Sequence, residues 1–266
     1  MGAGILRLMT STLYDQSFFD NCSPGASRSA EIVIPILMEM LQPQSVIDVG
    51  CGRGHWLAVF AQHGLSDYFG VDGAWVELEA LDIPRERFVV ADLQRPVQLD
   101  RRFDLVLSLE VAEHLPASAA DGFVQSLAAL GNRIVFSAAI PNQGGTGHEN
   151  EQWPTYWIER FAQHDFEALD VIRPRIWDRD EVEPWYCQNT FLFVRRGTPR
   201  PVSTAAAPVD LVHPRHYRKQ QTRLQELAIL VNPQTMPARY LASWVPAVLW
   251  AAVKRRLGLS RAGDRG

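Results

Sequence analysis

Residues 45–54 read SVIDVGCGRG, a short apolar run that ends in three alternating glycines. An apolar run of this length, bounded by glycines, is typical of a buried strand, and a helix is predicted over residues 56–63 directly after it. Gly50, Gly52 and Gly54 allow the backbone to turn tightly and to approach a ligand closely, and the first turn of the helix offers free N–H groups. The stretch therefore predicts a loop that binds a nucleotide-like cofactor, with a plain strand-to-helix turn as the alternative.

Strands and helices are predicted to alternate along most of the chain. Further apolar runs predict strands at residues 67–71, 88–91, 103–109, 133–138, 168–172 and 190–194. Further helices are predicted at residues 29–41, 74–81, 117–130 and 153–163. Such an alternation indicates a mostly parallel sheet that is covered on both faces, and ligands of these sheets bind beyond the carboxyl ends of the strands. The residues that follow each strand are therefore candidates for a functional site.

Acidic residues follow the first three predicted strands or lie at their ends. Asp48 stands two residues before a GxGxG loop, which differs from the dinucleotide pattern GxGxxG. An acid there would repel a pyrophosphate but suits a cationic amino-acid cofactor. Asp72 lies where an acid can bond both ribose hydroxyls, with a helix cap as the alternative. Asp92 can accept from an adenine amino group while Leu93 covers the ring, or it can be a turn residue.

The densest group of titratable side chains follows the fourth predicted strand. It consists of Glu110, Glu113 and His114 in the segment LEVAEHLP. Because Pro116 can open a helix, these residues could instead be first-turn and capping groups. A long polar loop rich in glycine follows the fifth strand and contains His148. Long loops beside a cofactor site often carry function.

These motifs in this order, with FDLVLSLEVAEHLP among them, resemble a class I S-adenosylmethionine-dependent methyltransferase over roughly residues 28–196. The resemblance implies an α/β fold with a Rossmann-like, doubly wound sheet of seven strands, the last antiparallel. It implies S-adenosylmethionine as cofactor, with the glycines at its methionine part, Asp72 at the ribose and Asp92 at the adenine. Arg28 would pair with the cofactor carboxylate. The residues assigned to the cofactor are Asp48, Gly50, Gly52, Gly54, Asp72, Asp92, Leu93, Glu110 and Arg28.

Within that class, the ExxEH pattern is similar to ubiquinone-pathway O-methyltransferases and to small-RNA 2′-O-methyltransferases. Both groups use the motif to hold a divalent metal, and the RNA group adds a histidine from the loop after strand five. The matching residues, and hence the candidate ligands for Mg²⁺ or another divalent metal, are Glu110, Glu113, His114 and His148. Many relatives carry the Glu-His pair without a metal, so both alternatives stay open.

The predicted catalytic residues are His148, Glu113 and His114. A hydroxyl acceptor needs a general base or a metal to become a nucleophile at neutral pH, and histidine titrates near neutrality. The segment around His148 also resembles bacterial methyltransferases, some of them from glycan or secondary-metabolite pathways. We therefore expect O-methylation of a glycan, a glycolipid or a small natural product. An RNA 2′-O-methyltransferase with a divalent metal and a non-catalytic cofactor-binding scaffold are the alternatives.

Composition and charge indicate a globular protein of two parts. The chain has 266 residues, of which 47% are hydrophobic and 21% charged, which excludes a disordered chain. Its three cysteines include no CxxC pair, so we expect a reducing cytoplasm rather than a disulfide scaffold. Residues 1–199 carry a net charge of −12 and residues 200–266 one of +8. We expect a methyltransferase domain over 1–199 and a basic, mostly helical extension over 200–266.

The basic extension predicts a docking role. Residues 240–253 are almost wholly apolar, and Lys254, Arg255 and Arg256 follow them. Such a stretch can pack on the domain or on a partner, or residues 240–256 can contact the inner face of the membrane peripherally. No signal peptide or membrane span is predicted from the sequence. Nucleic acid is disfavoured because the acidic domain would repel phosphates.

Overall fold

The computed structural model describes residues 16–201, 208–231 and 249. The chain divides into two compact units between His213 and Pro214. Residues 208–213 belong to the first unit, although they lie beyond the predicted domain boundary at residue 199. The guanidinium of Arg173 donates to the carbonyl oxygens of Pro208 and Val209, both at 2.8 Å. The boundary between catalytic domain and extension stays a prediction.

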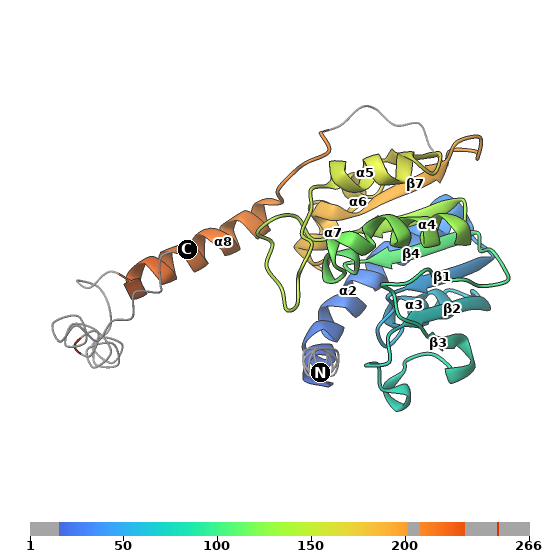
Figure 1. Ribbon diagram of the computed structural model, residues 1–266, viewed down its shortest axis with the longest axis horizontal. Helices are drawn as coiled ribbons and strands as arrows, with labels where there is room; N and C mark the ends of the chain where they lie inside the picture. Colours follow the sequence, from blue (N-terminus) through green and yellow to red (C-terminus); the bar gives the residue numbers. More distant parts are fainter. Residues whose placement is uncertain (1–15, 202–207, 232–248, 250–266) are drawn as a thin grey trace, which may run out of the picture. The chain divides into compact units, whose positions relative to one another are not determined.

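The first unit is built on one seven-stranded sheet with the order β3-β2-β1-β4-β5-β7-β6 (Figure 1). Strands β1 to β5 are parallel, and β7 runs antiparallel to both β5 and β6. This confirms the predicted Rossmann-like fold. The strands are β1 (Ser45–Val49), β2 (Asp67–Asp72), β3 (Phe88–Val90), β4 (Leu105–Leu109), β5 (Arg133–Ser137), β6 (Phe166–Leu169) and β7 (Phe191–Arg195).

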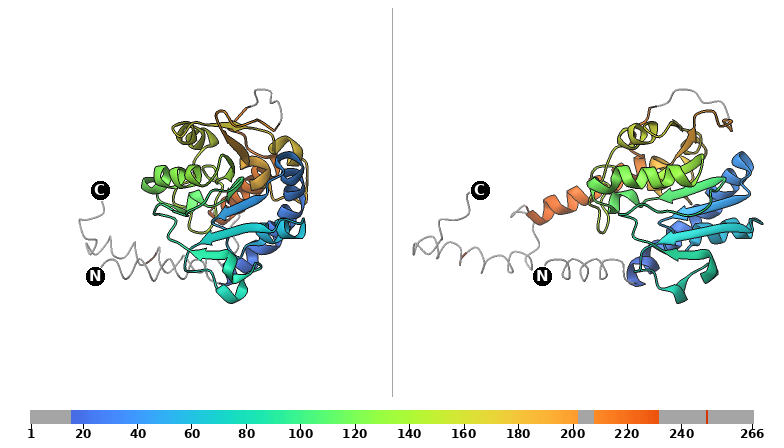
Figure 2. Two further views of the ribbon diagram at one scale, coloured as in Figure 1. Left: turned by 90° about the vertical axis from the view of Figure 1, so that its right-hand side faces the viewer. Right: turned by 45° about the vertical axis from the view of Figure 1, so that its right-hand side comes forward.

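Helices cover both faces of this sheet (Figure 2). They are α2 (Gln16–Leu41), α3 (His55–Gln62), α4 (Ala120–Leu130), α5 (Pro154–Ala162), α6 (Arg173–Ile176) and α7 (Pro184–Asn189). Neighbouring residues of β1 point to opposite faces: Val46 packs in the core with α2 and α3, and Ile47 in the core with α4 and α5. Burial of each strand on two faces explains why the strands are nearly continuous apolar runs.

Strand order reverses between β1 and β4. From β1 the chain adds β2 and β3 on one side, and then crosses to add β4 and β5 on the other. The carboxyl ends of β1 and β4 therefore border the position where doubly wound sheets bind their ligands. The glycine loop follows β1, and the segment with Glu110 follows β4.

Several predicted element bounds were wrong. The predicted helix at 74–81 is a turn followed by one 3-10 turn, η1 (Leu78–Ala80). The predicted strand at 168–172 corresponds to β6, which begins two residues earlier, at Phe166. Helices α6 and α7 were not predicted, because four and six residues are too few for a helical period to be read. Each begins with a proline in its first turn, which is a helix start that the sequence does offer.

The second unit contains α8 (Pro214–Val231), in agreement with the expected helical extension. The predicted membrane-contacting stretch at 240–256 lies almost wholly outside the described residues. Among the helices that the structure describes, none is long and apolar enough to span a bilayer.

Candidate functional site

The glycine loop after β1 has a backbone that only glycine adopts easily. Gly50 and Gly54 have φ values of +87° and +88°. A Cβ atom on Gly50 would lie 2.3 Å from a methyl group of Val111, and one on Gly54 would lie 2.9 Å from Ile83. Conformation and packing therefore both require glycine at these two positions. Val111 follows β4, so the same contact joins the loop to the segment that carries Glu110 and Glu113.

Two buried carboxyl groups lie beside this loop. Asp72 accepts the N–H groups of Gly52 and Gly73, both at 2.6 Å. Burial raises the pKa of Asp72 to about 6, although the two amides and the Trp75 indole bond to the carboxylate and lower it. Burial, and then the charge of Asp72, raise the pKa of Asp48 to about 8. A site with two neighbouring buried acids favours a ligand that carries positive charge.

Asp92 and Arg28, which were predicted to contact the adenine and the carboxylate of the cofactor, bond to other protein groups in this structure. The Asp92 carboxylate accepts the N–H of Gln94 at 3.0 Å and pairs with Arg95, as a turn residue would. Leu93 is buried. Arg28 forms an ion pair with Glu183 at 3.0 Å. The geometry thus joins Asp48 and Asp72 to the glycine loop, whereas the roles of Arg28 and Asp92 stay predictions.

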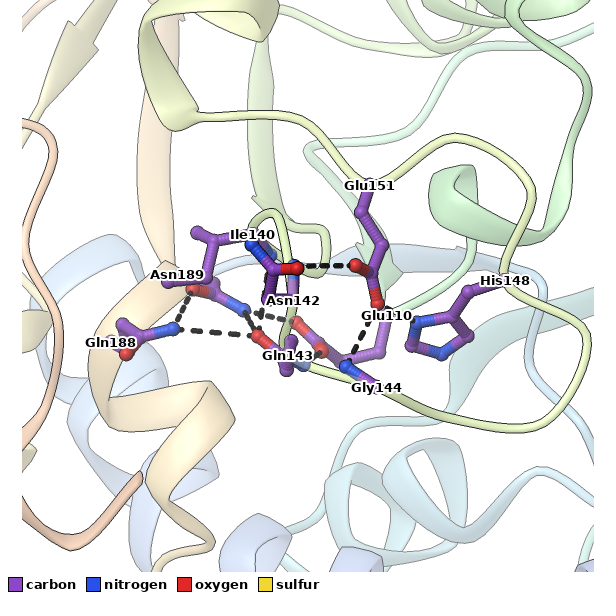
Figure 3. A network of polar contacts seen from close by, with 9 residues as sticks. All are labelled: Glu110, Ile140, Asn142, Gln143, Gly144, His148, Glu151, Gln188 and Asn189. Carbon is purple, nitrogen blue, oxygen red and sulfur yellow. Dashed lines mark hydrogen bonds and ion pairs between the residues drawn. The ribbon is translucent and has the colours of Figure 1, made fainter. Parts of the chain in front are cut away.

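Carboxamide side chains hold Glu110 at the end of β4 (Figure 3). Its backbone has φ of +55°, and its carboxylate accepts Nε2 of Gln143 at 2.8 Å and Nδ2 of Asn189 at 3.1 Å. Asn189 also donates to Oε1 of Gln143 at 2.9 Å. Burial raises the pKa of Glu110, and the bonds from Asn189 and Gln143 act against that rise. The network fixes Glu110 between the loop after β5 and helix α7.

Three further titratable groups gather next to Glu110. Ligand-type atoms of Glu113, His114 and His148 all lie within 4.8 Å of one another. The two histidine rings meet edge to face, with centroids 4.8 Å apart. Burial, and then His148, lower the pKa of His114 to about 4, although a bond to the Gly147 backbone raises it. Burial, and then Glu110, raise the pKa of Glu113 well above its usual value. His114 is thus neutral near pH 7, and burial favours the neutral form of Glu113.

Glu110 lies against Glu113 of this group, but it is not among the residues whose ligand-type atoms all lie within 4.8 Å of one another. The prediction made it a fourth metal ligand, but its carboxylate is occupied by Gln143 and Asn189. The His148 ring instead contacts Glu151, with Nδ1 2.8 Å from Oε1 (Figure 3). The role of Glu110 as a fourth metal ligand stays a prediction.

Residues 26–174, more than half of the chain, match the family model described as a methyltransferase domain. The chain belongs to this family. It is therefore an S-adenosylmethionine-dependent methyltransferase of class I, as the resemblance implied. No curated protein sequence matches the methyltransferase.

Solved structures share its fold. One is a candidate O-methyltransferase from Nostoc punctiforme, with 16% identity and a TM-score of 0.50 over 67% of this chain. The match covers 59% of that protein. Another is an S-adenosylmethionine-bound amino pentose methyltransferase from Micromonospora echinaspora, involved in calicheamicin biosynthesis. It has 17% identity and a TM-score of 0.50, and the match covers 62% of this chain and 89% of that one.

Helix α7 supplies further residues near the site of the methyltransferase. Asn189 reaches Glu110, and the Tyr186 ring packs edge to face on Trp56, with centroids 5.2 Å apart. Burial raises the pKa of Tyr186, and the charges of Glu110 and Asp48 raise it further, so Tyr186 lies near both acids. The sequence contains a signal for these contacts. Two carboxamides, Gln188 and Asn189, stand directly before an apolar strand, and polar groups that enter a core need hydrogen-bond partners.

Proposed function

We propose that this methyltransferase transfers the methyl group of S-adenosylmethionine to a hydroxyl group of a glycan, a glycolipid or a small natural product. One observation carries the proposal: Glu113, His114 and His148, with Glu151 behind His148, gather after β4 and β5 beside the glycine loop. A hydroxyl acceptor needs such a group to lose its proton, whereas the methyl donor needs no activation.

The cofactor fits the glycine-loop half of the site. Gly50, Gly52 and Gly54 leave room for close approach of the methionine part. A bound sulfonium would lower the raised pKa of the neighbouring Asp48 and favour its negatively charged form. Asp72 would accept the ribose hydroxyls, as acids at the end of a second strand do in this class of sheet. Leu93 would cover the adenine, with Asp92 accepting its amino group and Arg28 meeting the carboxylate.

His148 is the proposed general base. The Glu151 carboxylate bonded to Nδ1 favours the tautomer with a proton on Nδ1, which leaves the lone pair on Nε2 for the acceptor. The acceptor oxygen attacks the methyl carbon in line with the carbon–sulfur bond. That bond breaks to leave S-adenosylhomocysteine, and the hydroxyl proton passes to Nε2 of His148. Glu113 and His114 would line the same space.

A divalent metal such as Mg²⁺ is the alternative way to activate the hydroxyl, and the residues fit it. Among the described residues, neither carboxyl oxygen of the buried Glu113 has a hydrogen bond of normal geometry, although the backbone of residues 113 and 139 and the Glu110 carboxyl group lie near. His114 and His148 each bond through the ring to an oxygen acceptor, the Gly147 backbone and Glu151, as metal-binding histidines do. Glu113, His114 and His148 would hold the ion, which would lower the pKa of the bound hydroxyl.

The proposed acceptor is a small molecule or a glycan rather than a nucleic acid. The domain over residues 1–199 carries a net charge of −12, which opposes binding of a phosphate backbone. The amino pentose methyltransferase with the same fold acts on a sugar, so the scaffold can accommodate such an acceptor. An RNA 2′-O-methyltransferase would need the metal, and its turnover would depend on RNA.

Helix α8 fits a peripheral role of the basic extension. Tyr217, Leu224 and Leu227 are exposed and recur at spacings of seven and three residues, on one side of the helix. Its cationic residues are Arg215, Arg218, Lys219 and Arg223. An amphipathic basic helix of this kind can lie on an anionic membrane surface. We propose that residues 200–266, including 240–256, dock the enzyme there from the cytoplasmic side.

The deciding experiment has three arms on the full-length protein. Titration calorimetry with S-adenosylhomocysteine is expected to show binding, and its absence contradicts the cofactor assignment. Elemental analysis after exhaustive dialysis, with and without added Mg²⁺ or Zn²⁺, distinguishes the base from the metal. An acceptor screen that follows S-adenosylhomocysteine release is expected to respond to hydroxylated glycans or natural products. Turnover with RNA alone would overturn the proposed acceptor.

A further inference from the structure

Residue 73, which follows β2, is glycine because a side chain would not fit there, not because its backbone conformation requires glycine. Its φ does not lie in the left-handed region, in contrast to Gly50 and Gly54. A Cβ atom on Gly73 would lie 2.2–2.3 Å from three atoms of the six-membered ring of Trp75. The indole therefore lies directly against the Gly73 backbone, at a distance that no side chain at residue 73 would allow.

The same indole bonds to Asp72. Its N–H group adds to the two backbone amides on that carboxylate, and all three favour the ionised form. Trp75 nevertheless remains 36% exposed. A large aromatic side chain that stays partly in water, while its polar edge holds a buried acid, is placed to meet a ligand at that acid.

We propose that Trp75 is a positioning residue of the cofactor site, which orients the Asp72 carboxylate toward the ribose and forms a wall for the nucleoside. This inference rests on the proposed function, because it takes Asp72 as the ribose-binding acid. The turn from residue 73 to 76 brings the ring back over Gly73, with the Val76 N–H 3.3 Å from the Gly73 carbonyl oxygen. The Trp75 ring thus packs on the backbone of Gly73, and only Ala74 separates the two residues in the sequence.

Other ionisable groups near Asp72 have to be separated from it in a test. Asp48 on β1 and the Cys51 thiol of the glycine loop interact with Asp72 electrostatically. A pH profile of the wild-type protein reports all three groups together. The difference between wild type and Trp75→Phe isolates the indole N–H, because phenylalanine keeps an aromatic ring but has no donor.

The experiment measures S-adenosylhomocysteine affinity by titration calorimetry from pH 5.5 to 8.5. We expect Trp75→Phe to bind about ten-fold more weakly at pH 7, the usual effect of losing a hydrogen bond to a charged group. The pH midpoint of binding should also move upward, since the ionised Asp72 is less favoured. Gly73→Ala displaces the ring and should weaken binding in the same way. Trp153→Phe, at an indole of similar exposure (37%), is the matched control and should bind normally.

A second measurement does not require the ligand. The pKa of Asp72 is about 6, so the fluorescence of Trp75 should change with a midpoint near pH 6. The Trp75→Phe and Asp72→Asn proteins should lack that transition. If Trp75→Phe binds S-adenosylhomocysteine with wild-type affinity and pH midpoint, the inference is overturned while the proposed function stands. If the wild-type protein does not bind, the cofactor assignment fails and the role of Trp75 with it, whatever the fluorescence shows.

Discussion

Nδ1 of His148 lies 2.8 Å from Oε1 of Glu151, and that single carboxylate also anchors the loop in which both residues stand. Oε1 accepts the Gly144 N–H at 2.9 Å and Oε2 accepts the Asn142 N–H at 2.7 Å. The loop after β5 is fastened at its far side by the N–H groups of residues 149 and 150, which bond to the Glu113 carbonyl oxygen at 2.8 and 3.0 Å. One acid therefore sets both the loop shape and the histidine tautomer.

His148→Ala is expected to lower turnover by about 10²–10⁴, the range for loss of a general base. Glu151→Gln should lower turnover by only about ten-fold, because the imidazole of His148 remains. The double variant should be no slower than His148→Ala alone, since the two residues act as a unit. Steady-state kinetics measure all three, with His63→Ala, an exposed histidine at the end of α3, as control. Additive losses would mean that Glu151 acts independently of His148.

Gly145 is required for the position of the His148 ring. A Cβ atom there would lie 2.1 Å from Nε2, although the Gly145 backbone is not left-handed. Gly145→Ala should therefore displace the imidazole and lower turnover by about 10–100-fold, while affinity for S-adenosylhomocysteine is unchanged. The control is Gly122→Ala in α4, where no atom lies within 4 Å of the added Cβ. That variant should keep its turnover and gain about 0.5–1 kcal/mol of stability. Normal turnover of Gly145→Ala contradicts a catalytic His148.

Asp72→Ala should abolish binding of the cofactor and its product. The carboxylate has to be ionised to accept the ribose hydroxyls, and its pKa of about 6 lies above the usual value because of burial. Affinity in the wild-type protein should therefore fall as the pH drops through about 6. Titration calorimetry at pH 5, 6, 7 and 8 measures this, with Asp100→Ala, an exposed acid, as control. Unaltered affinity of Asp72→Ala would remove the ribose assignment.

The sequence predicted the central part of the molecule well, because each strand there is buried on both faces. Val46 and Ile47 pack in opposite cores, which favours consecutive apolar residues over an alternating pattern in this strand. The tight turn after β1 was also predicted from its glycines. A side chain at residue 50 would collide with Val111, so only glycine fits at that position.

Contacts between distant segments could not be predicted in this way. Asn189 reaches Glu110 across 79 positions of the sequence, and no periodicity encodes that pairing. The ExxEH pattern suggested that Glu110 and Glu113 lie together, and their carboxyl groups do interact. The pattern did not show that Gln143 and Asn189 also bond to the Glu110 carboxylate. Trp75 was missed because its role depends on the turn that returns it to Gly73.

Asp48→Asn should stabilise the protein, and more so at high pH. The pKa of Asp48 is raised from 3.8 to about 8 by burial and by Asp72. The unfolded chain therefore ionises first as the pH rises, and stability is lost between about pH 4 and pH 8. A neutral amide escapes this loss, so we expect a gain on the order of 5 kcal/mol at pH 8, from about four pH units at about 1.4 kcal/mol each, and little change at pH 4. Urea unfolding at both pH values measures it; equal gains at the two would contradict the raised pKa.

Arg173→Met should strongly destabilise the fold. Arg173 is 1% exposed and bonds to both oxygens of Asp170, at 2.9 and 2.7 Å, as well as to the carbonyls of residues 188, 208 and 209. Methionine fills the space but leaves Asp170, whose side chain is only 14% exposed, charged and without its ion-pair partner, which costs about 3 kcal/mol. The control is Arg179→Ala, whose partner Glu181 is exposed, and which should cost less than about 1 kcal/mol. Chemical denaturation measures both, and similar losses would mean that the buried pair contributes no more than the exposed one.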